Sequence, residues 1–597
     1  MSYPIFDRRA LAQALKELLP NKEQYDAAIE TGHCVVVAGP GSGKTKTLTT
    51  AMARALIDDV IDPRGVACIT YNNECATELE ERLTHFGVAN SERNFIGTVH
   101  SFALNQVIIP YSRCISGLLP NDFRVATRNE CRTAVEVAYE ALFGNVGDPH
   151  ARWRFAEEKR RRDVNRLLPI WQSKNPELAI FIETYEAELR RSGLIDFDDM
   201  PLIAFRMIKE HVWIRNAIQS RYPVLFVDEY QDLGQALHEL VLLLCFEGGV
   251  RLFAVGDADQ SIYGFNGANP GLLDSLIARK EVNVFRLRFN YRSSAKIIRA
   301  SMGALGEERN YRGPDGTADG ELGFHEVNGD YDAQARYIAK KLLPSLTERG
   351  FLLERIGVLY RAAWLGDKLA DAFQAENIAL IRADSNALIK RSSRLARFIE
   401  ACSQWVTGGW KEALPPFNLL LGQAISIIYG RRVSQDEEQT ITLQLISFLR
   451  SGIDQGETAN EWLKRLNTQL FSQWQLLSEN SHQEWEICTE LIKRTDPAQG
   501  FDIPLKIFAG KIDASGRVTL STLHSAKGRE FDVVILYGVN RYDFPSKRDS
   551  ASVQATREAR RLFYVGVTRP RKELHMVYEK GKHSPWLNEV YHRSQQE

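Results

Sequence analysis

The sequence predicts an α/β protein with parallel sheets and mostly helical insertions. Short apolar runs alternate with amphipathic helical segments along most of the 597 residues. Some runs, such as 34–38 and 224–227, are apolar at every position, which is typical of strands buried on both faces. These runs lead into glycine-rich or acidic turns. No window approaches 18 apolar residues, so we expect no membrane span.

Composition narrows the class of protein only slightly. The 44% hydrophobic and 25% charged fractions are ordinary for globular proteins, and a net charge of -1 gives no indication of nucleic acid. A basic surface would have to be a local groove. Eight cysteines without a C-x-x-C pair argue against zinc, iron–sulfur and disulfide frameworks, and favour a reducing cytoplasm. The N-terminus lacks the apolar segment of an export signal.

The first element is the strand–turn–helix segment around "AGPGSGKT", residues 38–45. It matches G-x-x-x-x-G-K-[ST] except that Ala38 replaces the first glycine. Glycines allow successive N–H groups to point at phosphate oxygens, Lys44 would reach the β- and γ-phosphates, and Thr45 would bind Mg²⁺. A chance glycine turn is the alternative, and the remaining motifs decide between them. The candidate nucleotide-binding residues here are Ala38, Gly39, Pro40, Gly41, Ser42, Gly43, Lys44, Thr45 and Lys46.

The second element is "PVLFVDEYQDLG", residues 223–234, in which an apolar strand ends in two acids. Asp228 would hold Mg²⁺, directly or through water. Glu229 would orient and polarise the attacking water, as phosphoryl-transfer sites require. A solvated acidic turn is the alternative, but it fits poorly because the acids end a hydrophobic strand.

Three further strings supply partners for this site. "LFAVGDADQSIYGFNGA" (252–268) places Gln260 after a strand, where it would sense the γ-phosphate or the water. "LRFNYRSS" (287–294) and "RRLFYVGVTRP" (560–570) place Arg292 and Arg569 beside aromatic residues. Both arginines are candidates for stabilising charge on the transferred phosphoryl group. An arginine considered alone is more often part of a surface ion pair.

Together these strings resemble the motifs of the UvrD/Rep group of superfamily 1 DNA helicases, in the same order along nearly the whole chain. The other strings in the series are "PNKEQ" (20–24), "ITYNNECATEL" (69–79), "GTVHSF" (97–102), "LIDFDDM" (194–200), "IGVLYRAA" (356–363) and "VTLSTLHSAKGREFDVV" (518–534). The resemblance implies two RecA-like P-loop motor domains with ATP and Mg²⁺ between them. It also implies 3′→5′ movement on single-stranded DNA and action on tailed duplex DNA.

The resemblance also implies roles for individual residues. Gln24 would read the adenine edge, Tyr291 would stack on adenine, and Glu530 would bind ribose. Arg292 and Arg569 would contact the γ-phosphate from the second motor domain. The candidate DNA-binding residues are Tyr71, Asn73, His100, Phe265 and His524. Three positions depart from the usual pattern and put the grip on DNA in doubt: Glu74 in place of Lys, Phe265 in place of Trp, and Asn266 in place of Arg.

The family's layout gives the expected domains. Residues 1–103 and 193–280 would form motor domain 1A, with a helical insertion 1B at 104–192. Residues 281–385 and 516–597 would form motor domain 2A, with a shortened helical insertion 2B at 386–515. Only residues 570–597 follow Arg569, so we expect no nuclease domain there.

Two stretches allow more than one interpretation. The run Lys159–Arg162 in "EEKRRRDVNRLL" favours a solvated helix face, with a duplex or strand contact as the alternative. The aromatic residues of "EWLKRLNTQLFSQWQLL" (461–477) favour a helical core over a nucleic-acid platform.

Two functional hypotheses remain. The first is a DNA-stimulated ATPase that translocates and unwinds duplex in repair, recombination or replication. The second is an ATPase subunit that regulates a partner nuclease, for example in anti-phage defence, with little unwinding of its own; a nuclease encoded next to it would favour this. The motifs at 287–294, 518–534 and 560–570 exclude nucleotide kinases and transporter-type P-loop ATPases.

Overall fold

The structure is a computed structural model. It describes residues 7–596 except 71–72, 89–92, 121, 145, 265–267, 385–392, 413–414, 430–432, 454, 478–482, 498–503 and 510–515. The chain forms two compact units. The first contains residues 1–126, 131–328 and 526–597, and the second contains 127–130 and 329–525.

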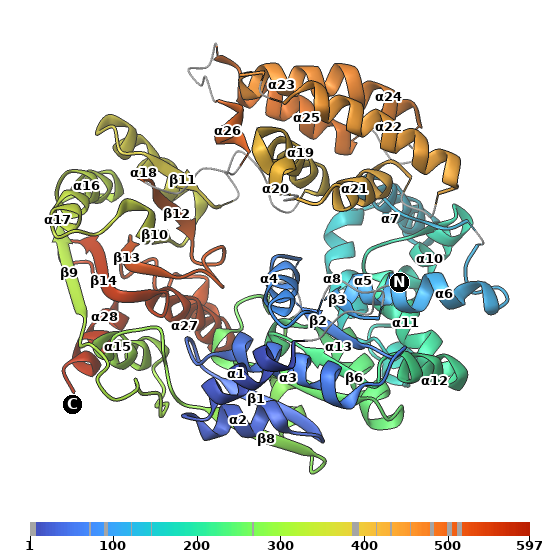
Figure 1. Cartoon of the computed structure of the whole chain (residues 1–597), viewed down its shortest axis with the longest axis horizontal. Helices are drawn as coiled ribbons and strands as arrows, with labels where there is room; N and C mark the ends of the chain where they lie inside the picture. The colour runs from blue at the N-terminus through green and yellow to red at the C-terminus, as the bar shows by residue number, and fades with distance from the viewer. Residues whose placement is uncertain are drawn as a thin grey trace. The chain divides into compact units, whose positions relative to one another are not determined.

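A six-stranded parallel sheet is the framework of the first unit (Figure 1). Its order is β3-β2-β6-β7-β1-β8, so the strands carrying the predicted phosphate and acid motifs, β1 and β6, flank β7. The predicted parallel α/β fold is confirmed here. The strands are β1 (His33–Ala38), β2 (Val66–Thr70), β3 (Phe95–Thr98), β6 (Val224–Val227), β7 (Arg251–Gly256) and β8 (Val282–Leu287).

Both faces of this sheet are buried, because alternate side chains of each strand enter different apolar clusters. Val35, Ile69 and Leu225 belong to one cluster, whereas Val36 and Phe226 belong to the other. The first face packs against α5 (Val99–Phe102), α11 (Asp199–Glu210), α12 (Val212–Arg221), α13 (Gln235–Val241) and α14 (Gly271–Ile277). The second packs against α1 (Arg8–Leu18), α2 (Lys22–Ile29), α3 (Lys44–Arg54) and α4 (Asn73–Thr84).

The last strand of this sheet, β8, follows the expected end of motor domain 1A at residue 280. It pairs with β1 over six residues, from His33 opposite Val282 to Ala38 opposite Leu287. The chain therefore completes the first sheet before it reaches Arg292.

A helical insertion separates the two halves of the first sheet. Its core gathers around Trp171, Phe181 and Tyr185. Its helices are α7 (Arg128–Phe143), α8 (Pro149–Arg162), α9 (Ile170–Ser173) and α10 (Pro176–Arg191). A short parallel pair, β4 (Arg124–Val125) and β5 (Leu194–Ile195), lies where the chain enters and leaves it.

The solvated helix face predicted for Lys159–Arg162 is wrong for its first half. Lys159 and Arg160 are only 2% and 1% exposed. Lys159 pairs with Asp163 at 3.0 Å and lies over the Trp171 ring, while Arg160 pairs with acids beyond the run itself. Only the next two arginines of the run are substantially exposed. The run's own sequence does not reveal these acids, since they come from residues 186–199.

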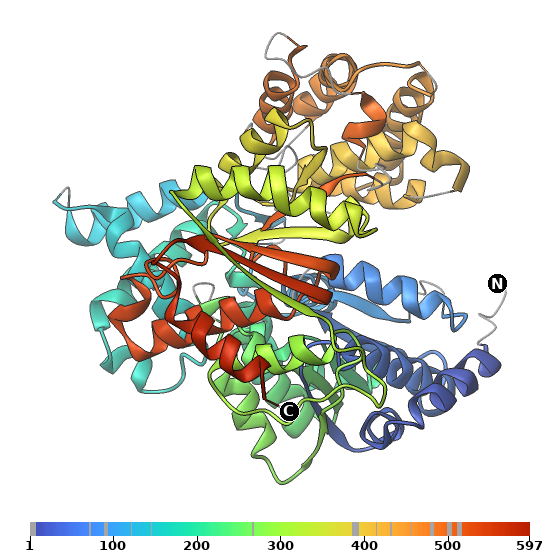
Figure 2. The same ribbon diagram turned by 90° about the vertical axis from the view of Figure 1, so that its left-hand side faces the viewer.

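The C-terminal part of the first unit contains three parallel strands and three helices. Strand β14 (Pro570–Glu579) lies between β13 (Phe531–Tyr537) and β9 (Glu321–Val327). Figure 2 shows the red and yellow-green strands of this group side by side. Helix α15 (Ala295–Leu305) packs against α27 (Val553–Val567) and α28 (Pro585–Ser594). Arg292 and Arg569 therefore precede α15 and β14, respectively.

The second unit combines three parallel strands with a helical bundle. Strand β12 (Val518–Thr522) pairs with β10 (Ile356–Tyr360) and β11 (Leu380–Arg382). The neighbouring helices are α16 (Tyr331–Tyr337), α17 (Leu343–Glu348) and α18 (Ala363–Ala375). The bundle, orange in Figure 1, consists of α19 (Arg394–Gln404), α20 (Trp410–Glu412), α21 (Phe417–Ile428), α22 (Gln435–Ser451), α23 (Ala459–Leu466), α24 (Ser472–Leu477), α25 (Gln483–Arg494) and α26 (Leu505–Phe508).

The aromatic residues of the stretch 461–477 are core residues, as predicted, whereas Trp410 of α20 is exposed. Trp462, Phe471 and Trp474 are fully buried in one apolar cluster.

None of the described helices in either unit combines the length and apolar character that a bilayer crossing requires.

Candidate nucleotide and DNA site

The predicted phosphate loop joins β1 to α3. Gly41 and Gly43 have φ angles of 67° and 82°, a region that side chains other than glycine rarely adopt. Gly43 is the N-cap of α3, so Lys44 and Thr45 begin the helix and the free N–H groups of its first turn follow the loop. Lys46, also predicted to bind nucleotide, directs its ammonium to Glu17 at 2.8 Å.

Glycine is also required at position 39 because another segment approaches it closely. A Cβ added to Gly39 would lie 2.5 Å from Cζ of Tyr311. The phenol ring therefore packs directly on the loop backbone. Tyr311 follows α15, and its loop is fixed by the neighbouring Arg309, which makes a two-pronged ion pair with Asp259 at 2.7 and 2.8 Å.

Gly41 and Gly43 lie against residues of two other predicted motifs, those at 287–294 and 20–24. A Cβ on Gly41 would lie 2.5 Å from Oδ1 of Asn290 and 2.6 Å from Cβ of Arg292. A Cβ on Gly43 would lie 2.5 Å from Nε2 of Gln24. The three glycines therefore let the segments before α3 and after β8 close around the phosphate loop.

Gln24 and Tyr291, both predicted to contact adenine, lie beside this loop. Gln24 is buried, and its amide donates to the carbonyl of Ser42 at 3.0 Å. The Tyr291 ring is 50% exposed, its hydroxyl accepts a bond from Asn21 at 3.1 Å, and its N–H donates to the carbonyl of Gly41 at 2.8 Å. An exposed ring anchored to the phosphate loop is suited to stacking on a base.

Two acids follow β6 in different electrostatic states. Burial, followed by the charge of Glu229, raises the pKa of Asp228 to about 7. Burial alone would raise the pKa of Glu229 as well, but the charges of Lys44 and Lys527 hold it at about 2. Lys44 lies 3.5 Å from Glu229, whose backbone is left-handed at φ 48°. The strained turn thus aims an ionised carboxylate at the phosphate-loop lysine.

A continuous chain of polar contacts joins Glu229 to Arg569. Gln231 donates to Glu229 and accepts from the N–H of Asp257 at 2.8 Å. Asp257 accepts from Gln260 Nε2 at 2.6 Å, and Gln260 Oε1 accepts from Arg569 Nη2 at 3.1 Å. Lys44 and Arg569 therefore belong to one buried network within the first unit.

Arg569 is a buried cation whose hydrogen bonds, within the described residues, all go to neutral oxygens. It is 1% exposed and donates to Gln260, to Thr568 Oγ1 at 3.2 Å, and to the carbonyls of Val565 and Arg529. Burial, followed by the charge of Arg292, lowers its pKa to about 9. It therefore stays charged at pH 7, and an anion bound nearby would stabilise it.

Arg292 and Glu530 are partners in this structure. Arg292 donates to Glu530, whose other oxygen accepts from Arg571 at 2.7 Å. The two arginine charges hold the pKa of Glu530 below its usual value, although burial alone would raise it. The ribose contact predicted for Glu530 stays a prediction, since its carboxylate is bound here by two arginines.

The predicted DNA contacts are only partly described. Tyr71 and Phe265 lie outside the described residues, as do Asn266 and the side chains of Asn73 and Glu74. His524 belongs to the second unit.

His100, in α5, stacks on Phe197 with ring centroids 3.7 Å apart and ring planes 22° apart. Phe197 is 57% exposed, so the pair presents an aromatic face to solvent.

Several residues of this site were not predicted from the sequence. Lys527 donates to Asp232 and to the carbonyl of Gln260 at 2.6 Å, which ties its turn to both acidic motifs. A lysine in a polar turn of the string at 518–534 was an available signal. Phe197, flanked by acids at 194–200, was another. Nothing in the sequence around Tyr311 indicates that it packs on Gly39.

Comparisons with known proteins place the chain in a family. Residues 20–280 match a family model described as the UvrD/REP helicase N-terminal domain, and residues 441–581 match the UvrD-like helicase C-terminal domain. The chain is 23% identical to DNA helicase II of Haemophilus influenzae over 94% of this chain and 84% of that protein. It is 26% identical to the ATP-dependent DNA helicase PcrA of Leuconostoc citreum over 93% of this chain and 81% of that one. PcrA of Staphylococcus aureus is 25% identical over 94% and 83%.

Proposed function

The chain belongs to the UvrD/Rep family of ATP-dependent DNA helicases, and from that membership we propose how it works. It hydrolyses ATP with Mg²⁺ to move 3′→5′ along single-stranded DNA and to separate tailed duplexes. Its setting is the cytoplasm, in DNA repair, recombination or replication. The expected division into 1A, 1B, 2A and 2B is part of this proposal, with β8 added to the 1A sheet.

The buried charge of Arg569 is the observation that carries the proposal. The Arg569 guanidinium lies near the charge of Arg292, and its hydrogen bonds within the described part of the chain go only to neutral oxygens. Its buried positive charge is therefore poorly stabilised until an anion binds beside it. The γ-phosphate of ATP held at Lys44 is such an anion. Arginines in this role stabilise the charge that spreads over the equatorial oxygens during phosphoryl transfer.

The remaining groups divide the chemistry among them. The N–H groups at the start of α3 and the ammonium of Lys44 bind phosphate oxygens. Thr45 and Asp228 offer the oxygen ligands that Mg²⁺ prefers, and a bound ion would neutralise developing charge on the phosphates. Glu229, ionised at neutral pH, accepts a hydrogen bond from the attacking water and orients it. Gln260 connects that position to Arg569.

DNA would contact the face formed by His100 and Phe197. Stacked aromatic rings bind bases without regard to sequence, at roughly 1–3 kcal/mol per base. The exposed Phe197 ring offers that surface in the first unit, which also holds the nucleotide groups. We therefore assign Phe197 to the DNA site together with His100.

The test is ATP hydrolysis with and without oligo-dT, together with strand displacement on duplexes carrying a 3′ or a 5′ tail. We expect hydrolysis near background without DNA, strong stimulation with it, and displacement of the 3′-tailed duplex. Equal rates with and without DNA at every oligonucleotide length would refute the proposal. Displacement of only the 5′-tailed duplex would refute the polarity.

The regulatory-subunit hypothesis has less support. Its basis was the departures at Glu74 and Asn266 and the short helical insertion. The relatives reported above are named helicases over more than nine-tenths of this chain. Stimulated ATP hydrolysis without displacement of either tailed duplex would favour it.

A further inference from the structure

The insertion helix α8 contacts the turn that carries Phe197 through a buried cluster of opposite charges. Arg160, fully buried on α8, donates to both oxygens of Asp196 at 2.6 and 3.0 Å and to Asp199 at 2.5 Å. Its Nε donates to Glu186 of α10 at 2.8 Å. One guanidinium therefore joins α8, α10 and the turn between β5 and α11.

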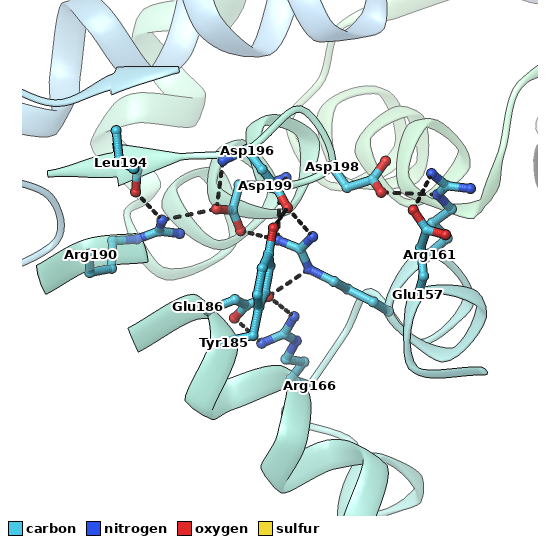
Figure 3. A network of polar contacts seen from close by, with 11 residues as sticks. Glu157, Arg161, Arg166, Tyr185, Glu186, Arg190, Leu194, Asp196, Asp198 and Asp199 are labelled. Carbon is cyan, nitrogen blue, oxygen red and sulfur yellow. Dashed lines mark hydrogen bonds and ion pairs between the residues drawn. The ribbon is translucent and has the colours of Figure 1, made fainter. Parts of the chain in front are cut away.

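The rest of this cluster fixes the acids from the other side. Figure 3 shows Tyr185, Glu186 and Arg166 below the turn and Arg190 beside it. Tyr185 donates to Asp196 at 2.7 Å, and Arg190 to Asp199 at 2.9 Å. Arg166 donates to both oxygens of Glu186. The charges of Arg160 and Arg166 hold the pKa of Glu186 at about 2, although burial alone would raise it.

Carboxylates of the turn also accept hydrogen bonds from backbone N–H groups of the same turn. The N–H of Asp196 donates to the Asp199 carboxylate at 3.1 Å, and the N–H of Asp199 donates to the Asp196 carboxylate at 2.7 Å. Asp198 pairs with Arg161 of α8 at 3.0 Å. Each acid around Phe197 is thus held by an arginine of the helical insertion. Phe197, between them, projects outward onto His100.

We propose that Arg160 is a positioning residue for DNA binding. Its ion pairs lock the turn at Asp196–Asp199, so that the Phe197 ring is held against His100 before DNA arrives. Pre-organisation of this kind lowers the entropy cost of binding a base. A lysine at position 160 would keep the charge but could not grip three carboxylates with a planar fork. This inference rests on the proposed DNA contact of Phe197.

The test is a double-mutant cycle on the full chain. Affinity for fluorescein-labelled oligo-dT is measured by anisotropy for the parent, Phe197→Ala, Arg160→Lys and the double variant. We expect Phe197→Ala to weaken binding about 10-fold and Arg160→Lys to weaken it about 5-fold. If Arg160 acts through Phe197, the double variant binds no more weakly than Phe197→Ala alone.

Matched controls separate positioning from general damage. Arg162→Ala removes an exposed arginine of the same helix, whose described partners are Asp163 and Glu158, and should bind DNA as the parent does. Arg161→Ala removes the partly exposed arginine that pairs with Asp198, and it should weaken DNA binding about 2-fold. This variant also serves as the test if Arg160→Lys does not fold.

The outcomes are distinct. Parental binding by Phe197→Ala would overturn the proposed DNA contact. Weak binding by Phe197→Ala but parental binding by folded Arg160→Lys would overturn the positioning role alone. Losses that multiply in the double variant would also overturn it, since Arg160 would then act independently of Phe197. If Arg160→Lys does not fold, parental binding by Arg161→Ala overturns the positioning role.

Discussion

Replacing Arg569 by methionine separates a catalytic arginine from a structural one. Methionine keeps much of the volume and removes the charge. If Arg569 meets the γ-phosphate, ATP turnover should fall by about 10³ or more, which corresponds to roughly 4 kcal/mol on the barrier. The KM for ATP should change much less, because the contact forms mainly in the transition state.

The same substitution should leave the stability of the nucleotide-free protein almost unchanged. The difference between the ordinary pKa of 12.5 and about 9 in the folded chain corresponds to roughly 5 kcal/mol against the charged form, as an upper bound. Arg569→Met removes this cost but also loses four hydrogen bonds, to Gln260, Thr568, Val565 and Arg529. At a net value of about 0.5–1.5 kcal/mol each, the lost bonds offset the gain. The unfolding temperature of the nucleotide-free protein should therefore change little. A structural ion pair would instead cost about 3–5 kcal/mol when broken.

The assays are steady-state ATP hydrolysis with saturating oligo-dT and the midpoint of thermal unfolding without nucleotide. Arg571→Met is the matched control, because Arg571 lies two residues after Arg569, is 48% exposed and donates to Glu530. It should keep turnover within a few-fold of the parent. A loss of turnover below 10-fold in Arg569→Met, with a clear drop in unfolding temperature, would refute the reasoning.

Three further predictions concern other groups of the site. Lys44→Ala should abolish ATP-dependent turnover and weaken binding of a fluorescent ATP analogue; undiminished binding would remove Lys44 from the phosphate site. Glu229→Gln should keep analogue binding and lose turnover, and hydrolysis at the parental rate would contradict the water-orienting role. Burial lowers the pKa of His100 to about 3, so its ring should stay neutral from pH 8 to pH 5 in an NMR titration. The stability that comes from burying a neutral His100 should be lost as the pH falls from about 6.5 towards about 3, because the unfolded chain takes up the proton first. An NMR titration midpoint near 6.5 for His100 in the folded chain would contradict the buried stack.

The sequence was most informative where chemistry sits directly after a strand. Lys44, Asp228 and Gln260 each follow an apolar run that became a strand of one parallel sheet. Parallel strands bring their carboxyl ends to one edge, so the motifs had to meet there. The same local logic placed Trp462 and Trp474 in a core, because their helical spacing fits a buried face.

Contacts between distant segments could not be predicted in this way. The charge of Arg160 is neutralised by acids 26 to 39 residues away, and no local pattern distinguishes such an arginine from a solvated one. The packing of Tyr311 on Gly39 is another long-range contact, whose only local trace is a glycine that the phosphate-loop pattern does not require. Burial of a charge depends on its partners, and partners are a property of the fold.

A structure of the chain with ADP, aluminium fluoride, Mg²⁺ and oligo-dT is the most direct test of the central claim. We expect the fluoride mimic of the γ-phosphate to lie within hydrogen-bond distance of both the Lys44 ammonium and the Arg569 guanidinium. A mimic held by Lys44 while Arg569 bonds only to protein oxygens would contradict it.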